Sequence, residues 1–461
     1  MDFPVFHLDF FGNRLLIAVI ATLHVLINHM LAVGAIPLVA FLEWLGLRSG
    51  DQRWDDLARR ILFVCFIVTT SLGALTGVGI WLSTSLVNPA AIGSLIRVFF
   101  WAWFFEWTVF VTEVVLILIY FLSWRTAWAR RHRRAHLGLG VLLAVFSWLT
   151  MAVIVAILGF QMDTGVWTVQ PGFWTAVLNP LYLPQLAFRT PFALVTAGLF
   201  ALMLTGLFTR GDREFRGTAV RTISIWSLVF TPAMLLGAWS YWQAIPERML
   251  ANLPTALTTL TFTDFLEPLR LAILASVVAV IAVCAWGVAA PRRLPALVLV
   301  VPFLLAVWQL SYFERVREFI RKPDVVAEYM YSNGLRASDY PLYREQGLLT
   351  LATYSPVGEV TEFNRHEAGR EMFRLACSRC HTTHGVNGVV EKLATMYGWQ
   401  DWDHATIDTY LQSMHNARPF MPPVPGNDAE RGALATYLID LRDDPAGLAG
   451  AQSHGAMPAS H

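Results

Sequence analysis

The chain has 461 residues, of which 56% are hydrophobic and 15% charged, and its mean hydropathy is +0.50. A soluble chain carries about 25% charged residues, so an ordinary soluble globule is excluded. The high apolar content and a net charge of only +1 also exclude a disordered chain. The 18 tryptophans and 30 phenylalanines are typical of a membrane protein with aromatic belts. We therefore expect a lipid bilayer, and no nucleic acid, as the partner of this chain.

Eight apolar segments reach the length of about 20 residues that a membrane-spanning helix needs. The predicted spans are residues 14–45, 59–86, 97–124, 137–161, 184–208, 221–244, 268–288 and 294–320. The first segment lacks a basic leading region and is too long for the apolar part of a signal peptide. The predicted fold is an all-α polytopic membrane bundle.

The arginines predict the orientation of the bundle. Fifteen basic residues lie on one set of alternate linkers, 47–60, 125–136, 209–221 and 290–293, whereas the other set contains only Arg248. Basic linkers stay on the cytoplasmic side of a membrane. This predicts an outside N-terminus, and eight spans return the chain to the outside at residue 321. The expected location is a bacterial inner membrane, with the C-terminal part in the periplasm.

The C-terminal part differs in composition. Residues 324–461 are polar and carry 17 acidic against 10 basic residues. We predict a membrane domain at 1–323, a linker at 324–358 and a soluble periplasmic domain at 359–461. The acidic balance either steers a basic electron-donor protein towards the domain or serves only solubility.

This soluble domain contains a haem-attachment motif. Cys377 and Cys380 have the spacing that forms two thioether bonds to haem, and the adjacent His381 reaches the iron. A zinc-binding or redox-active cysteine pair is the alternative. Residues 367–377 predict a helix before the motif, and residues 428–441 predict a closing helix.

The order of helix, motif, methionine loop and closing helix resembles a class I cytochrome c over about the last 90 residues. The resemblance implies one covalent haem c and a small α-helical domain. Met421 is the predicted sixth iron ligand, because a methionine thioether suits an electron carrier. Met414 and Met396 are its rivals.

Ionisable residues inside a membrane span are costly and are candidates for function. Four stand out: His24, Glu106, Glu113 and Glu318. From a rise of 1.5 Å per residue, His24 and Glu106 both lie about 15 Å below the outer surface. Glu113 lies two turns further in on nearly the same face, so the two glutamates are candidates to relay protons. Glu318 lies near the outer end of the last span.

A second layer of charge lies at the outer boundary, where three arginines either bind the propionates of a haem or only extend to the membrane surface. These are Arg14, Arg270 and Arg321. We interpret His29 as a hydrogen-bonded histidine, Cys65 and Cys284 as core residues, and Glu314, Arg315 and Arg317 as a charge network at the outer surface.

The membrane part resembles subunit I of the cytochrome bd oxidase superfamily over residues 5 to 323. The resemblance rests on six features in order: Arg14 ten positions before His24, Gly-Ala-Leu-Thr-Gly ending at Gly77, Glu106 with Glu113 on the third span, Val177-Leu-Asn-Pro180 with Thr196, Pro268-Leu-Arg270, and Glu318-Phe-Ile-Arg321-Lys-Pro323. It implies that His24 and Glu318 bind two membrane haems of b or d type, with Glu106 beside them or itself a ligand. It also implies a homologous partner subunit II. Glu113 departs from the family by one position.

The departures from the family concern the low-spin haem b and the quinol site. Phe188 stands where the family has a haem-ligating histidine, and Ala272 stands where it has the partner methionine. The quinol-binding loop is shortened to residues 245–266, and the haem c domain takes the place of the ninth family helix.

Together these features predict a bd-type oxidase that takes electrons from a periplasmic donor, a cytochrome c by expectation, through haem c. Oxygen or another small molecule such as nitric oxide would be reduced at a two-haem site. The alternatives are an electron-transfer subunit of a larger respiratory complex and a haem-based sensor, although the sequence contains no recognisable output domain.

Overall fold

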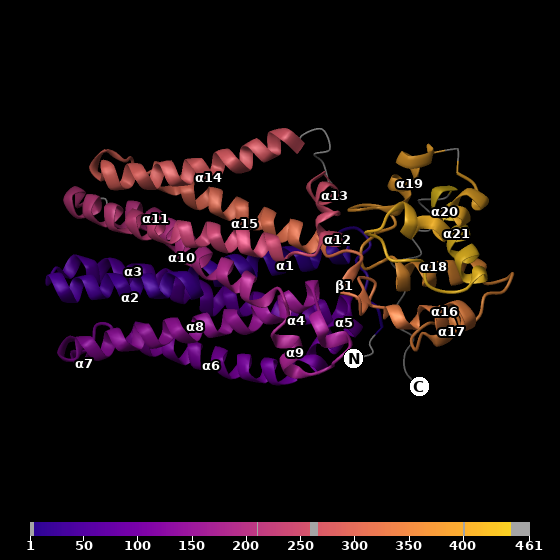
Figure 1. Cartoon of the computed structure of the whole chain (residues 1–461), viewed down its shortest axis with the longest axis horizontal. Coiled ribbons are helices and arrows are strands. Elements are labelled where there is room, and N and C mark those ends of the chain that lie inside the picture. The colour runs from indigo at the N-terminus through magenta and orange to yellow at the C-terminus, as the bar shows by residue number, and fades with distance from the viewer. Residues whose placement is uncertain (1–3, 210, 259–265, 400–401, 444–461) are drawn as a thin grey trace. The chain divides into compact units, whose positions relative to one another are not determined.

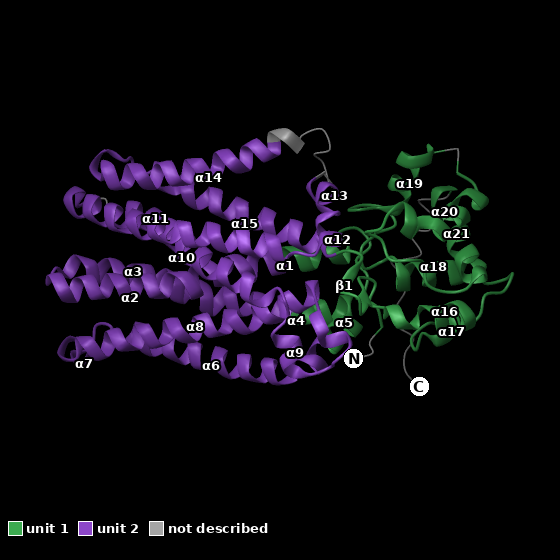
Figure 2. Cartoon of the chain, in the orientation of Figure 1, with its two compact units in different colours: residues 1–19, 81–94, 322–461 green, residues 20–80, 95–321 purple. Residues whose placement is uncertain are grey.

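The protein is described by a computed structural model that covers residues 4–209, 211–258, 266–399 and 402–443. These residues are almost entirely helical (Figure 1). The chain divides into two compact units, which Figure 2 colours separately. Unit 1 contains residues 1–19, 81–94 and 322–461, and unit 2 contains residues 20–80 and 95–321.

Within the described residues, eight helices are long and apolar enough to cross a membrane, which confirms the predicted spans. The first two spans each contain a π-helix: α1 (Asn13–Ile27), η1 (Asn28–Gly34) and α2 (Ala35–Ser49), then α3 (Gln52–Val68), η2 (Thr69–Gly73) and α4 (Ala74–Val87). The other six are α6 (Phe100–Ser123), α8 (Arg133–Met162), α10 (Tyr182–Phe208), α11 (Arg213–Ala244), α14 (Leu266–Ala289) and α15 (Val301–Ile320).

Short helices connect the spans. They are α5 (Pro89–Val98), α7 (Ala127–Arg131), η3 (Gly165–Thr168), α9 (Phe173–Val177), α12 (Glu247–Leu250), α13 (Leu253–Thr258), η5 (Pro291–Arg293) and η6 (Val298–Val300). The polar linkers supply the helix caps. Asp51 accepts a hydrogen bond from the backbone N–H of Arg53 at 3.0 Å, and Asp212 accepts one from that of Phe215 at 2.9 Å. Each cap satisfies an N–H that a helix start leaves without a partner. The shortened loop 245–266 lies partly outside the described residues.

The centre of unit 2 is formed by the first and fifth spans, in which 67% and 72% of the most apolar window is buried. Helix α10 packs against α11, α8, α2 and η1. Cys65 and Cys284 are 0% and 1% exposed, which confirms their interpretation as core residues. Because these helices hold one another on several sides, polar side chains on them are fixed in position.

The C-terminal part of unit 1 begins with a small antiparallel sheet of β1 (Asp324–Val326) and β2 (Met330–Tyr331), in which Asp324 pairs with Tyr331. The helices that follow are η7 (Ala337–Asp339), α16 (Tyr340–Gln346), α17 (Leu348–Leu351), α18 (Arg365–Ala376), α19 (Val389–Tyr397), α20 (His404–Ala417) and α21 (Asp428–Asp443). Helices α18 and α21 confirm the two helices predicted on either side of the attachment motif.

Helices α18 and α21 cross at Gly369. A Cβ at this position would lie 2.1 Å from the backbone oxygen of Ala433, which is far inside a normal contact. Only glycine therefore permits this crossing. Met372, Phe373 and Tyr437 fill the core around it and are each at most 3% exposed.

We expect Gly369→Ala to destabilise the C-terminal domain by about 1–3 kcal/mol, because the added methyl group forces the two helices apart. Thermal unfolding of the full-length protein, followed through haem c absorbance, measures the effect. Gly432→Ala in α21 is the control, since the nearest atom to its new Cβ lies 4.0 Å away. Equal stability of the two variants would contradict the close crossing.

Candidate functional site

The haem-attachment motif follows α18 as a helical turn. The backbone N–H groups of Cys380 and His381 both donate to the oxygen of Cys377, at 3.0 and 2.9 Å. The Nδ1–H of His381 donates to the backbone oxygen of Asn387 at 3.1 Å. Histidines that bind a metal usually donate their second ring N–H in this way, which leaves Nε2 directed at the metal. Burial, together with the charges of Lys392 and Arg14, lowers the pKa of His381 to about 4, so the imidazole is neutral as a ligand must be.

The two cysteines of the motif are free thiols in this structure. Burial, and then the neighbouring Cys380, raise the pKa of the Cys377 thiol to about 12. A zinc ligand or a redox-active cysteine needs a thiol that ionises readily. No group of three or more histidine, cysteine, aspartate or glutamate side chains that could hold a metal ion lies in the described part of the chain. The motif therefore fits covalent haem better than zinc or redox chemistry.

Met421 lies in a loop whose backbone is held on both sides. Its N–H donates to the oxygen of Arg418 at 2.8 Å, and its own oxygen accepts from Nδ1 of His415 at 2.6 Å. The rival Met396 is 37% exposed, and its sulfur accepts from Nη2 of Arg418 at 3.5 Å. Met421 and Met414 are both half-buried. Met421 remains the predicted sixth ligand because its loop is fixed.

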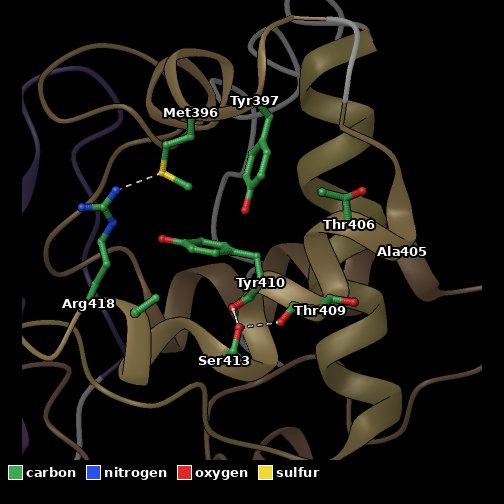
Figure 3. A pocket seen from close by; sticks show the side chains of 9 residues that line it. Met396, Tyr397, Ala405, Thr406, Thr409, Tyr410, Ser413 and Arg418 are labelled. Carbon is green, nitrogen blue, oxygen red and sulfur yellow. Dashed lines mark hydrogen bonds between the residues drawn. The ribbon is translucent and has the colours of Figure 1, made fainter.

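A cavity of about 780 Å³ lies beside this loop (Figure 3). It is lined by side chains of α19 and α20 and by Arg418, among them Met396, Tyr397 and Tyr410. The two tyrosine rings meet edge to face at 6.2 Å. The cavity has the size of a small aromatic cofactor, but the attachment cysteines, His381 and Met421 do not line it.

In the membrane part, His24 lies at the end of α1, immediately before η1. Asn28 Nδ2 donates to Nε2 of His24 at 2.6 Å, so the ring proton lies on Nδ1, which donates to Oγ1 of Thr76 at 3.1 Å. A Cβ at Gly77 would lie 3.2 Å from Cε1 of His24. Thr76 and Gly77 thus fix the tautomer and leave space beside the ring. Nε2, the nitrogen that would bind iron, accepts the hydrogen bond from Asn28 in this structure, so iron would have to replace that bond.

Glu106 and Glu113 both lie on α6, where their charges interact. Glu113 accepts hydrogen bonds from two hydroxyl groups of α8, from Ser147 at 2.7 Å and from Thr150 at 3.2 Å. Glu106 is half-buried. The two carboxyl groups are seven residues apart on α6, and Glu113 lies on the face of this helix that contacts α8.

Glu318 and Arg321 form an ion pair near the end of α15. Arg321 Nη2 donates to Oε2 of Glu318 at 2.6 Å, and its Nη1 donates to Oε1 of Gln161 at 2.8 Å. Arg321 is only 5% exposed, so it does not simply extend to the membrane surface. Arg270 is exposed at the start of α14, and Arg14 is half-buried at the start of α1. The roles of these residues in binding haem remain predictions.

Phe188 of α10 lies in a cluster of aromatic rings. Its ring stacks on Tyr241 with an interplanar angle of 3°, and it lies 5.4 Å from the rings of both Phe192 and Phe313. These rings come from three helices and surround the position that the resemblance assigns to a haem-ligating histidine. Neither Phe188 nor Ala272 can bind iron, and packed side chains surround Phe188.

Next to this cluster lies a buried charge network that the sequence analysis missed. Arg189 donates to His29 Nε2 at 3.0 Å and to Glu314 Oε1 at 2.8 Å, and Arg317 Nε donates to the other oxygen of Glu314 at 2.8 Å. Arg189 and Glu314 are 1% and 6% exposed. The prediction that Glu314 and Arg317 belong to the outer surface is therefore wrong, whereas the hydrogen-bonded role of His29 is confirmed. The available signal was a lone arginine inside an apolar span.

A second unpredicted network joins α2, α6 and α8. Oε1 of Glu43 accepts from Nδ1 of His136 at 2.6 Å, and Oε2 accepts from the hydroxyl group of Tyr120 at 2.6 Å. Nε2 of His136 faces the backbone oxygen of Tyr120 at 3.2 Å. Both ring nitrogens thus face oxygen atoms. All three residues are at most 4% exposed.

Comparisons with known proteins agree with both predicted resemblances. Residues 364–438 match the family model described as "Cytochrome C oxidase, cbb3-type, subunit III". The chain is also similar to a chain of the bd oxidase from Geobacillus thermodenitrificans, with a TM-score of 0.54 and 17% sequence identity. That match covers 70% of this chain and 92% of the other. No curated protein matches the chain. The protein therefore combines a membrane bundle with the bd oxidase fold and a C-terminal cytochrome c domain.

We expect Met421→Ala to lower the reduction potential of haem c, because a thioether ligand raises the potential of a histidine-ligated haem. Potentiometric titration of the full-length protein measures the change. Met414→Ala serves as the matched control and should leave the potential close to its original value. A large fall in the Met414 variant alone would make Met414 the ligand.

We expect Phe188→His not to produce a low-spin haem signal in the membrane part, because Tyr241, Phe192 and Phe313 fill the surrounding space. Electron paramagnetic resonance of the oxidised protein provides the measurement. The double variant Phe188→His/Ala272→Met should also lack the signal. A new bis-ligated low-spin haem in either variant would contradict the view that this site has been replaced by packed side chains.

Proposed function

We propose that this protein is the haem-bearing subunit of a bd-type oxidase that receives electrons through its own haem c. Cys377, Cys380 and His381 would hold the haem c that takes electrons from a periplasmic donor, expected to be a cytochrome c, and His24, Glu106 and Glu318 would surround the two-haem site that these electrons reach. Oxygen is the proposed acceptor. Each oxygen molecule takes four electrons and four protons and yields two water molecules, while four ferrous donor haems become ferric.

The observation that carries this proposal is the aromatic cluster around Phe188. The rings of Tyr241, Phe192 and Phe313 occupy the surroundings of the residue that replaces a haem ligand in the resemblance. A quinol oxidase needs that haem to accept electrons, so this chain needs another input. The cytochrome c domain supplies a one-electron input in the same polypeptide.

The haem groups would be held by residues whose geometry suits ligation. His381 directs Nδ1 to a fixed acceptor and would bind iron through Nε2. His24 directs Nδ1 to Thr76, and its Nε2 would bind iron in place of the hydrogen bond from Asn28. Haem iron supplies one-electron transfer and, where a coordination position is open, binding of a small gas molecule. Glu318 is held near the end of α15 by Arg321 and is the proposed ligand on the second membrane haem.

Protons for the reaction are proposed to move along α6. Tyr120, Glu113 and Glu106 are spaced by seven residues, so they lie on one face of the helix. Tyr120 belongs to the network with Glu43 and His136, and Glu113 is held by Ser147 and Thr150. Carboxyl and hydroxyl groups in a row can pass protons through a span that is otherwise apolar.

A second membrane subunit, homologous to subunit II of the bd oxidases, is the proposed partner. Helix α6 exposes a large apolar surface that includes Phe104, Trp107, Val111 and Leu122. Such a surface suits contact with lipid or with another membrane helix. The proposed setting is the bacterial inner membrane, with the cytochrome c domain in the periplasm.

We expect His24→Ala to remove the gas-binding haem from the membrane part and to abolish oxygen consumption, while haem c remains attached. Difference spectra of the reduced protein with and without carbon monoxide measure the loss. His132→Ala, on the connection between α7 and α8, is the control and should keep both the haem and the activity. Absence of any carbon monoxide-binding haem in the unsubstituted protein would exclude the oxidase and favour an electron-transfer subunit.

A further inference from the structure

The buried charge network around Arg189 shares one carboxylate between two guanidinium groups. Nη2 of Arg189 donates to Oε1 of Glu314 at 2.8 Å, and Nε of Arg317 donates to Oε2 at 2.8 Å. Arg189 and Glu314 are 1% and 6% exposed, and the side chain of Arg317 is 11% exposed. All three residues belong to unit 2, and direct hydrogen bonds join them.

His29, the fourth member of the network, adds no charge to it. Its Nε2 accepts a hydrogen bond from Nη1 of Arg189 at 3.0 Å, so this nitrogen carries no proton. Its Nδ1 faces the backbone oxygen of Val25 at 3.1 Å and therefore carries the single ring proton. The imidazole is neutral in this arrangement, and Glu314 is the only negative charge that the network itself contains.

The neighbouring ion pair does not balance the network either. Glu318 follows Arg317 in the chain, but its Oε2 accepts from Nη2 of Arg321 at 2.6 Å. The network and this ion pair together contain three arginines and two glutamates, which leaves one positive charge in excess. A charge without a partner is costly in the apolar interior of a membrane bundle. The site therefore needs an anion.

Two buried N–H groups are the donors that such an anion would use. Within the described residues, Nε of Arg189 and Nη1 of Arg317 have no hydrogen-bond partner. They belong to the two guanidinium groups that Glu314 already joins. A buried water molecule satisfies an N–H group but does not balance a charge. A carboxylate does both, and guanidinium groups match it in geometry.

We propose that Arg189 and Arg317 bind a carboxylate group, supplied by a propionate of a membrane haem. The unpaired buried donors fit such a group, since a haem carries two anionic propionates. The sequence analysis assigned this role to Arg14, Arg270 and Arg321, so the site is additional to those predictions. The inference rests on the proposed function only in that a membrane haem is present.

The position of Arg317 on α15 supports this source of the carboxylate. Glu318, the proposed ligand of the second membrane haem, is the next residue, and Glu314 lies one helical turn earlier. A single turn of α15 therefore carries a candidate iron ligand and a candidate propionate donor. Arg189 brings the second donor from α10, and its guanidinium group lies 5.7 Å from the centre of the Phe313 ring.

The test is a potentiometric titration of the membrane haems in full-length protein with Arg317→Gln. A cation beside a propionate disfavours the ferric state, so its removal should lower the potential of one membrane haem by a tenfold change in equilibrium constant, about 59 mV for one electron. Arg317→Lys keeps the charge and should recover most of the shift. Loss of that haem from the Gln variant, with retention in the Lys variant, would equally support the site.

Arg315→Gln is the matched control, because it removes the same charge from the same helix. The guanidinium group of Arg315 lies over the ring of Tyr312 at 4.9 Å, and its Nη2 lies 3.4 Å from the backbone oxygen of Ala256. Two residues correspond to about 200° around a helix, so Arg315 and Arg317 lie on nearly opposite faces of α15. The control should leave the potential of each membrane haem unchanged.

Three outcomes would overturn the assignment. The first is a protein that contains no membrane haem, and the second is an Arg317→Gln variant with unchanged membrane-haem potentials. The third is thermal stabilisation by added acetate that the unsubstituted protein shows and the Arg317→Gln variant lacks, because the carboxylate would then come from solution. The titration needs no oxygen turnover. A lowered membrane-haem potential in a protein that consumes no oxygen would support the site and contradict the oxidase.

Discussion

A buried charge inside an apolar bundle must have a partner, and this constraint determines the centre of unit 2. Arg189 of α10 and Glu314 of α15 are almost fully buried and are joined at 2.8 Å. Removal of one member of such a pair leaves an uncompensated charge and is strongly destabilising. Because Arg317 and His29 complete the network, it ties η1, α10 and α15 together next to Phe188. An ion network and aromatic rings therefore fill the space between these helices around Phe188.

The replacement of a haem-ligating histidine by Phe188, as the resemblance implies, is the reason why the cytochrome c domain matters for electron input. A chain with the bd oxidase fold but without an intact low-spin haem site has no internal electron acceptor for quinol. The covalent haem is fixed by two thioether bonds, which makes it independent of the packing of the membrane helices. Within unit 1, Phe10 and Val87 accept hydrogen bonds from Val386 and Arg379 of the attachment region. In the proposed function, the replacement of one haem site and the presence of a cytochrome c domain belong together.

Much of the fold could be predicted from the sequence because its signals are local. Long apolar runs define the eight spans, and the haem-attachment motif with its two flanking helices defines the cytochrome c domain. His24 and Glu113 were recognised because a polar residue in an apolar run is conspicuous. Arg189 was overlooked although it is also a polar residue in an apolar run. The pairing of Glu43 with His136 is different, because it joins residues 93 positions apart. No local pattern specifies such a pairing, since it arises from the packing of α2 on α8.

The two π-helices show how the site around His24 depends on both spans at once. η1 starts four residues after His24, and η2 ends three residues before Thr76. A π-helical turn adds one residue to a helix and rotates the side chains that follow relative to those that precede it. In the first span the π-helix lies between His24 and Glu43. In the second span it directs Thr76 and Gly77 to the imidazole, where a hydroxyl group and an absent side chain are both needed. The contact between His24 and Thr76 therefore joins two spans at points next to their π-helices.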